Sequence, residues 1–124
     1  MKRAQLGIVG LVAALFVGCD NGRPPVSSSL EEATVQGTVK VKGKPLTKGT
    51  ITFDPANVER KVGPRTAPIN PDGTYTIKTL IGANTVTVQS PTFGRDPNLA
   101  MNERSMDVES GENQLSIEIP RANP

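Results

Sequence analysis

The chain of 124 residues contains no histidine and no tryptophan, and its single cysteine is Cys19. Zinc and most transition-metal sites depend on histidine or cysteine ligands, so this composition predicts no metal and no other cofactor. Ser-His-Asp and Cys-His catalysis each require a histidine, and one cysteine cannot form an internal disulfide. The composition therefore predicts a protein that is not an enzyme, and we expect no small-molecule substrate.

Aromatic side chains are also scarce, since Phe53, Tyr75 and Phe93 are the only ones beyond the first 18 residues. Single-stranded nucleic acids and many sugars bind on exposed rings, and a core of this size needs at least two of these three. The formal net charge is +2, from 14 basic and 12 acidic residues. Two of the basic residues, Lys2 and Arg3, lie at the extreme N-terminus, so the rest of the chain is neutral. A neutral chain predicts no nucleic-acid partner.

The N-terminus has the pattern of an export signal. Lys2 and Arg3 precede an apolar run, residues 6–18, that ends at Gly18-Cys19. A basic start, a short apolar stretch and small residues before a cleavage point are typical of a secretory signal peptide. As a helix the run would span about 20 Å, less than the roughly 30 Å of a bilayer's hydrocarbon core, so we expect no transmembrane helix.

The segment Val17-Gly18-Cys19 resembles the lipobox of bacterial lipoproteins, in which the cysteine thiol is alkylated with diacylglycerol. This resemblance implies signal cleavage between Gly18 and Cys19, a lipid anchor on Cys19 and a location outside the cytoplasm at a cell-envelope membrane. Phe16 departs from the pattern, which usually has leucine there. Two or more acyl chains make anchoring stable, at about 0.8 kcal/mol per buried CH₂. The alternative is an ordinary signal peptide whose removal releases a soluble secreted domain.

Composition divides the whole chain into four parts. We predict a lipoprotein signal peptide at residues 1–18 and a flexible tether at 19–33, which is rich in proline and serine and has no apolar period. Residues 34–120 contain short alternating runs bounded by glycine and proline, which is typical of one β-rich domain. Residues 121–124 form a short C-terminal tail.

Seven short runs are predicted to be β-strands because apolar side chains recur at every second position. These runs are residues 35–41, 49–54, 66–69, 74–79, 84–90, 105–109 and 114–119. Pro68 is expected to confine its strand to a sheet edge, and the last two strands are expected to pair as a hairpin around Gly111. The chain is therefore predicted to be all-β, a seven-stranded antiparallel β-sandwich that follows an N-terminal signal helix.

Several of these segments match a known pattern. They are Val35-Gln36-Gly37-Thr38-Val39, Gly43-Lys44-Pro45-Leu46, Gly49-Thr50-Ile51-Thr52-Phe53, Pro71-Asp72-Gly73-Thr74-Tyr75, Val86-Thr87-Val88 and Gly111-Glu112-Asn113. Together they resemble carboxypeptidase regulatory-like, transthyretin-like domains over roughly residues 34–119. The resemblance implies a prealbumin-like sandwich in a non-catalytic module that packs on partners, stiffens stalks or presents loops. One enzymatic branch of that fold hydrolyses 5-hydroxyisourate with histidines, which this chain lacks.

Two segments are candidates for contact with a partner. One is a hairpin that carries Lys40, Lys42, Lys44 and Lys48. It is expected either to bind an anionic cell-wall polymer or to form only a solvated face.

The other candidate is the loop at residues 91–103 with Arg104 beside it, because exposed loops on a rigid sandwich often bind partners. Its alternative role is a passive crossover between sheets. The candidate contact residues of this segment are Phe93, Arg95, Asp96 and Arg104.

These observations predict a lipid-anchored, extracytoplasmic, non-catalytic binding or structural module of the bacterial cell envelope. One alternative is an adaptor subunit of an envelope complex, which would have a stoichiometric protein partner. The other is a cell-wall polymer binder that uses the hairpin between Lys40 and Lys48. The membrane, reached through the lipid anchor, is the first expected partner in each case.

Overall fold

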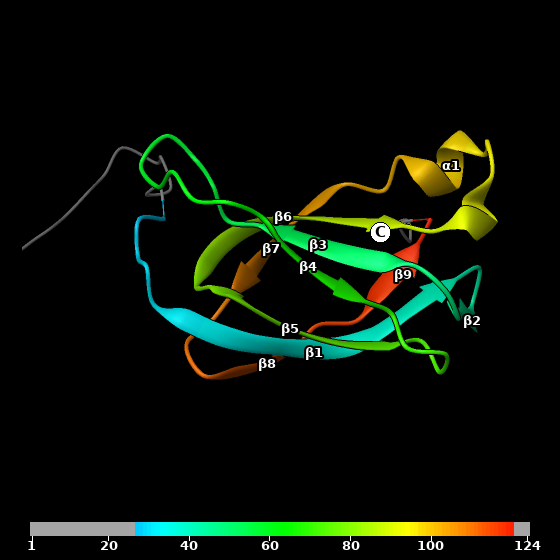
Figure 1. Ribbon diagram of the computed structural model, residues 1–124, viewed down its shortest axis with the longest axis horizontal. Coiled ribbons are helices and arrows are strands. Elements are labelled where there is room, and N and C mark those ends of the chain that lie inside the picture. The colour runs from blue at the N-terminus through cyan, green and yellow to red at the C-terminus, as the bar shows by residue number, and fades with distance from the viewer. Residues whose placement is uncertain (1–26, 121–124) are drawn as a thin grey trace, which may run out of the picture.

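The computed structural model describes residues 27–120. The predicted signal peptide, the predicted cleavage and lipidation site at Gly18 and Cys19, and the C-terminal tail lie outside the described residues. Within residues 27–120 the chain is an all-β sandwich of two sheets (Figure 1). The helices in this part of the chain are all too short to cross a membrane.

The first sheet is built around β1 (Glu32–Val41), which begins inside the segment predicted to be the tether. β5 (Thr74–Leu80) lies antiparallel along the first part of β1, and the two-residue β2 (Lys44–Pro45) returns along its end. On its opposite edge β1 pairs with β8 (Glu112–Gln114) and then with β9 (Ile117–Ile119), both parallel to it.

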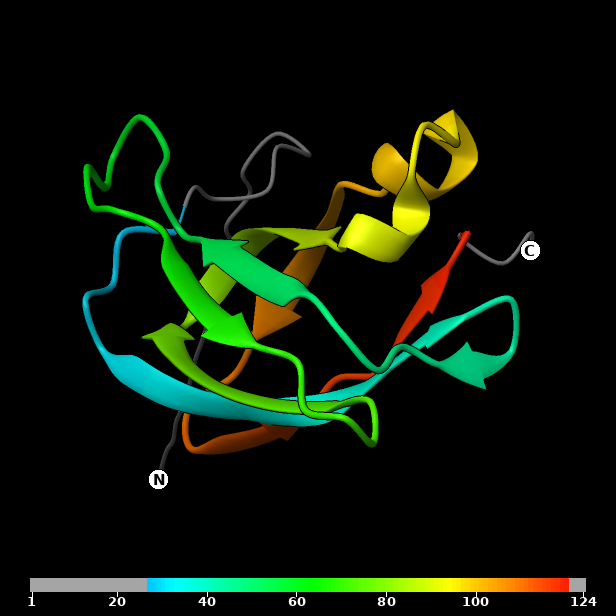
Figure 2. The same ribbon diagram turned by 45° about the vertical axis from the view of Figure 1, so that its right-hand side comes forward.

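The second sheet has the strand order β4-β3-β6-β7, with antiparallel neighbours throughout. Its members are β3 (Thr50–Asp54), β4 (Arg65–Pro68), β6 (Gly82–Gln89) and β7 (Arg104–Val108). Pro68 lies in the edge strand β4, as predicted. A proline has no backbone N–H to donate to a neighbouring strand, so it is tolerated where only one side of the strand is paired. Figure 2 shows this sheet stacked over the first.

The hydrophobic core lies between the two sheets. Alternate residues of β1, β3, β5 and β6 point into it, which confirms the period-two pattern of the sequence. Its central members are Val35, Val39, Ile51, Phe53, Tyr75, Ile77, Val86, Val88, Ile117 and Ile119. The rings of Phe53 and Tyr75, one from each sheet, lie 6.1 Å apart between their centroids.

The closing segment differs from the sequence-based prediction. The predicted hairpin between residues 105–109 and 114–119 is wrong, because β7 pairs with β6 in one sheet while β8 and β9 pair with β1 in the other. The pairings with β1 are parallel, so the sandwich is not purely antiparallel. Residues 27–120 contain nine strands where seven were predicted.

The side chain of Asn113 holds the crossing between the sheets. Its Oδ1 accepts from the Glu109 N–H at 2.8 Å, and its Nδ2 donates to the Glu109 carbonyl at 2.8 Å. The same Nδ2 donates to the carbonyl of Thr34 on β1 at 3.2 Å. One amide thus ties the end of β7 to the first sheet.

Gly37 is required where β8 passes into β9. There the chain turns inward, and the Leu115 carbonyl oxygen lies 2.0 Å from the place that a Cβ on residue 37 would occupy. Tyr75 lies opposite Gly37 on β5, and its hydroxyl donates to the same oxygen at 2.5 Å. Burial raises the pKa of the Tyr75 hydroxyl, which keeps it protonated and able to donate.

Candidate functional site

The predicted lysine hairpin lies at the end of β1 that is remote from residue 27 (Figure 1). Lys42 and Gly43 form its turn with positive φ angles of 54° and 84°. Positive φ at both central residues is the mark of a type I′ turn, the two-residue connection that suits twisted strands. Lys40, Lys42, Lys44 and Lys48 are all exposed.

The connection between β6 and β7, predicted to be a plain loop, contains two short helices. These are η1 (Pro91–Phe93) and α1 (Pro97–Ala100), and each begins with a proline after a capping side chain. Proline is favoured at the first helical position because its missing N–H has no helical partner there. Ser90 and Asp96 supply the caps by accepting from backbone N–H groups.

The structure brings both predicted contact segments to the same end of the domain. The Ser90 hydroxyl donates to the Lys48 carbonyl at 2.6 Å, which fixes the start of η1 beside the lysine segment. The Arg104 guanidinium donates at 2.8 Å to the carbonyl of Glu118, which is the register partner of Lys40. We call the exposed cations of this region the basic end. Its members are Lys40, Lys42, Lys44, Lys48 and Arg95, which lies between η1 and α1.

The predicted contact residues of the loop have different roles. Arg95 is exposed, whereas Asp96 is half-buried and caps α1 through the Asn98 N–H at 2.9 Å. Arg104 is half-buried and ties β7 to β9. Phe93 is only 5% exposed and packs in the core, so its prediction as a contact residue is wrong. The turn of η1 directs this ring inward, which an aperiodic segment could not indicate.

Asn102 anchors the same connection to the second sheet. Its Nδ2 donates to the Val88 carbonyl at 2.9 Å, and its Oδ1 accepts from the Val88 N–H at 2.8 Å. Nδ2 also donates to the carbonyl of Leu99 at 2.6 Å. The side-chain amide thus makes the two hydrogen bonds that the backbone of a paired strand residue would make to Val88. It does so just before β7 begins to pair with β6 at Arg104. This arrangement positions the loop that carries Arg95.

The opposite end of the domain, where residue 27 enters, holds a buried arginine that the sequence analysis missed. Arg60 is 2% exposed, and its guanidinium donates four hydrogen bonds, all to backbone carbonyls. The acceptors are Pro55 at 2.9 Å, Ser29 at 2.6 Å, Ile81 at 2.7 Å and Ala83 at 3.2 Å. Arginine suits this task because its donors form a rigid fork.

A second buried polar group holds the turn between β5 and β6. The Asn84 Nδ2 donates to the carbonyls of Leu80 at 2.9 Å and Gly82 at 3.1 Å. Its Oδ1 accepts from the Thr79 hydroxyl at 2.6 Å. We call this region, with Arg60, the anchor end. A strand pattern alone gave no signal for either residue, because their partners are backbone carbonyls and, for Asn84, also the Thr79 hydroxyl.

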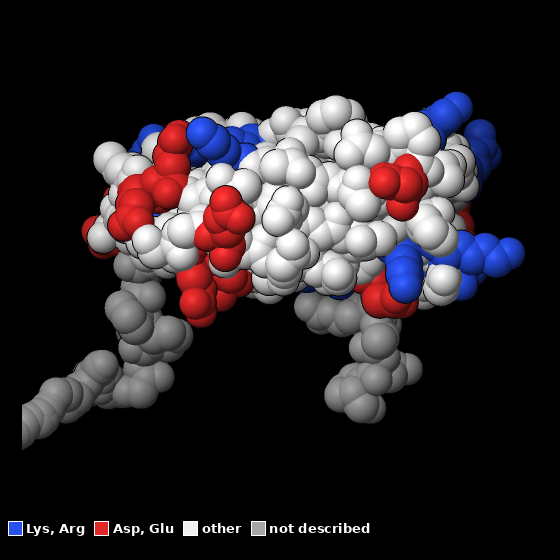
Figure 3. Space-filling model, turned by 90° about the horizontal axis from the view of Figure 1, so that it is seen from below, with Lys and Arg blue, Asp and Glu red and all other residues white. Residues whose placement is uncertain are grey.

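Charge is distributed unevenly along the first sheet. Figure 3 shows most of the acidic side chains of this face gathered at one end, with a largely uncharged middle. At the anchor end the exposed carboxylates include Glu31, Glu32 and Glu112, near the start of β1 and β8. Neither end carries one sign alone, because exposed Lys78 lies opposite Thr34 at the anchor end and exposed Glu118 pairs with Lys40 at the basic end.

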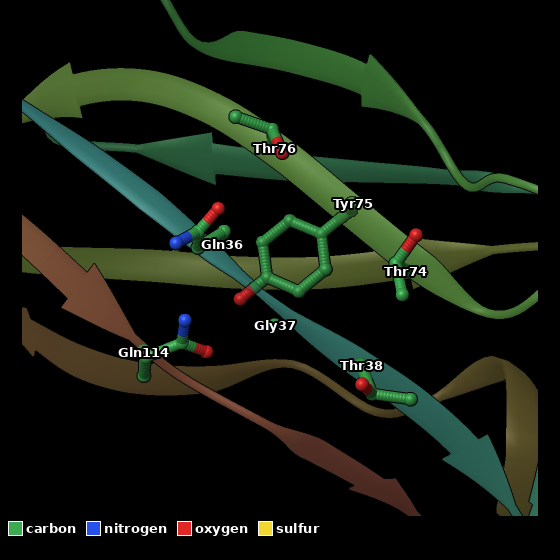
Figure 4. A pocket seen from close by; sticks show the side chains of 7 residues that line it. All are labelled: Gln36, Gly37, Thr38, Thr74, Tyr75, Thr76 and Gln114. Carbon is green, nitrogen blue, oxygen red and sulfur yellow. The ribbon is translucent and has the colours of Figure 1, made fainter.

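A shallow pocket of about 320 Å³ lies on the uncharged middle of this face (Figure 4). Five hydroxyl and amide side chains line it, from β1, β5 and β8. They are Gln36, Thr38, Thr74, Thr76 and Gln114. Gly37 and Tyr75 complete the lining, and the Tyr75 hydroxyl is already bonded to Leu115. This lining can bond a polar ligand but supplies no charged group. Among residues 27–120, no three His, Cys, Asp or Glu side chains are grouped so as to hold a metal ion.

A comparison with protein-family models gives no match, and no curated protein matches closely enough to count as a relative. Among solved structures, the fold is similar to a DUF3823 family protein from Parabacteroides merdae. The TM-score is 0.52, with 16% sequence identity over 73% of this chain and 47% of that chain. The Bacillus anthracis TIE protein is similar with a TM-score of 0.50 and 10% identity, over 95% of this chain and 19% of that one. The chain thus spans less than half the length of either protein, and the likeness is one of fold.

Proposed function

We propose that this protein is a lipid-anchored, non-catalytic binding module of the bacterial cell envelope. Cys19 holds it at a membrane, on the side away from the cytoplasm, and the basic end meets a partner. The observation that supports this proposal most is the placement of the two ends. The chain enters at the anchor end, and β1 carries it to the lysine turn. Ten residues of strand at about 3.3 Å each place these points roughly 33 Å apart.

The finer type of sandwich that we propose is the carboxypeptidase regulatory-like, transthyretin-like domain. Its support is the residue pattern of the opening strands and of the turn at Asp72-Gly73. In that turn Asp72 accepts from the Thr74 N–H at 3.1 Å and from the Thr74 hydroxyl at 2.7 Å. These bonds lower the pKa of the Asp72 carboxyl, and they give this exposed acid a structural role.

The chemistry of the basic end suits a partner that is rich in carboxylate or phosphate groups. The lysine ammonium groups lie on exposed side chains, and each is a compact charge that can follow an irregular anion. Met101, which directly follows α1, is 80% exposed. An exposed apolar residue on the same connection as Arg95 favours a folded protein as the partner, in which case this chain is an adaptor subunit.

A second candidate function is binding of an anionic cell-wall polymer through the same lysines. It is favoured by their spread around a turn and along the approach to β3. The two candidates differ in salt sensitivity, because 0.5 M salt reduces the Debye length to about 4 Å. Polymer binding is expected to be lost at that concentration, whereas an interface with buried apolar contacts is retained.

Replacement of Cys19 by alanine tests the anchor. The wild-type protein is expected to enter the detergent-rich phase of cell extracts, and the mass of its N-terminal peptide is expected to include acyl chains on Cys19. The Cys19→Ala protein is expected in the aqueous phase. If Cys19→Ala still partitions with detergent, the lipid-anchor proposal is wrong.

A further inference from the structure

Five residues before the first strand are bound to the body of the domain. We call residues 27–31 the strap. The Ile81 N–H donates to the Glu31 carbonyl at 3.0 Å, and the Ala83 N–H donates to the Ser27 hydroxyl oxygen at 3.0 Å. The strap therefore follows the turn between β5 and β6, and does not hang free as the tether prediction implied.

Two side chains from one short turn hold the strap from the other side. Arg60 donates through Nη1 to the Ser29 carbonyl at 2.6 Å, and Asn57 donates through Nδ2 to the Ser27 carbonyl at 2.8 Å. Asn57 and Arg60 also bond each other through their backbones, at 2.9 and 3.2 Å. The two donors are thus placed by a single closed turn.

Hydrogen bonds hold the strap, with little apolar burial. Leu30, its one large apolar residue, is 68% exposed. A segment with few buried apolar contacts opens at a lower free energy than the core does. The strap can therefore separate from the domain while the two sheets stay folded.

We infer that the strap is a length stop: while it is bound, it limits the maximum distance between the domain and the membrane. This inference rests on the proposed lipid anchor at Cys19. Eight residue steps separate Cys19 from Ser27, and an extended chain of this length spans at most about 27 Å. Release of the strap as far as Glu32 leaves 13 steps, or about 44 Å. The bound strap keeps the anchor end close to the bilayer, and its release extends the reach of the basic end.

Stepwise release of the strap in vesicles tests this inference. The full-length lipidated protein is reconstituted into phosphatidylcholine vesicles that contain an acceptor dye on the lipid. A donor dye is attached at Glu112→Cys, an exposed position at the anchor end outside the strap. The acylated Cys19 has no free thiol, so only position 112 is labelled. Energy transfer reports the distance between the anchor end and the bilayer.

Two variants are expected to lengthen this distance by different amounts. The double change Ser27→Ala and Asn57→Ala removes the bonds to Ser27 and leaves Ser29 bound, so the maximum reach rises from about 27 to about 34 Å. Adding Arg60→Met to the double change also removes the bond to Ser29, so that Glu31, which Ile81 and Ser110 still bond, becomes the first held residue and the maximum reach rises to about 41 Å. Arg65→Met, which changes an arginine that bonds only the nearby Gly63 carbonyl, is expected to leave energy transfer unchanged.

The outcomes separate the two proposals. A decrease in energy transfer in the double variant, with near-wild-type circular dichroism, supports the length stop even if the triple variant does not fold. Unchanged transfer in a folded double variant and a folded triple variant overturns it. Unchanged transfer in the double variant also overturns it when the triple variant is unfolded. A wild-type protein that does not float with the vesicles instead overturns the lipid anchor.

Discussion

The two ends of the domain are stabilised in different ways. At the anchor end, Arg60 and Asn84 are buried, and their side chains bond only backbone carbonyls and one hydroxyl. At the basic end the lysines are exposed, and a backbone turn at Lys42-Gly43 positions them. Buried polar groups with satisfied bonds fix a single geometry, whereas exposed cations remain available to a partner. This difference agrees with the proposed division, in which attachment is at one end and recognition is at the other.

The largest expected effect is at Arg60. Arg60→Met keeps much of the side-chain volume but leaves four carbonyls without their donor. An unsatisfied buried group costs about 1–3 kcal/mol, so we expect the free energy of unfolding to fall by at least about 3 kcal/mol. Denaturant unfolding followed by circular dichroism measures this. The matched control Arg65→Met is expected to change stability by less than about 0.5 kcal/mol, and equal effects of the two changes would contradict the comparison.

A smaller loss is expected where the loop of the basic end joins the second sheet. Asn102→Ala removes two bonds to Val88 and one to Leu99, with an expected cost of about 2 kcal/mol. Hydrogen exchange is expected to be faster at the Val88 amide, while exchange in β1 and β5 changes little. Asn98→Ala, at an exposed position on α1, serves as the control. If both variants leave the Val88 amide equally protected, Asn102 does not hold this loop.

The smallest effect is expected at the lysine turn, and it is stabilising. Lys42 adopts a φ of 54°, which asparagine tolerates better than lysine does. Lys42→Asn is expected to raise the free energy of unfolding by about 0.5 kcal/mol. Lys44→Asn removes the same charge from a strand position, where no such gain is expected. Equal shifts in the melting temperature of the two variants would show that the charge, and not the turn, is responsible.

The sequence predicted much of the sheet structure, because burial on one face produces alternation. Residues 35–41, 49–54 and 74–79 correspond to β1, β3 and β5, and Pro68 correctly indicated an edge. Alternation indicates which face of a strand is buried but not which sheet the strand joins. The closing segment was therefore predicted as a hairpin although its strands belong to different sheets.

The sites were predicted less completely. The two contact segments were identified separately, but their meeting depends on the bond from Ser90 to Lys48, which no local pattern contains. Arg60 lies in a charged, irregular stretch, and charged side chains are rarely buried. Its carbonyl acceptors at Ser29 and Ile81 lie 31 and 21 residues away in the chain. Only the tertiary fold brings these groups together.

Site-specific photo-crosslinking in living cells would test the division between the two ends most directly. A photoreactive amino acid is placed at Lys44 of the basic end or at Val58, an exposed residue of the anchor end, in the lipidated full-length protein. The account predicts one dominant non-lipid partner at Lys44 and none at Val58. Capture of the same partner at Val58, or of no partner at Lys44, would contradict it.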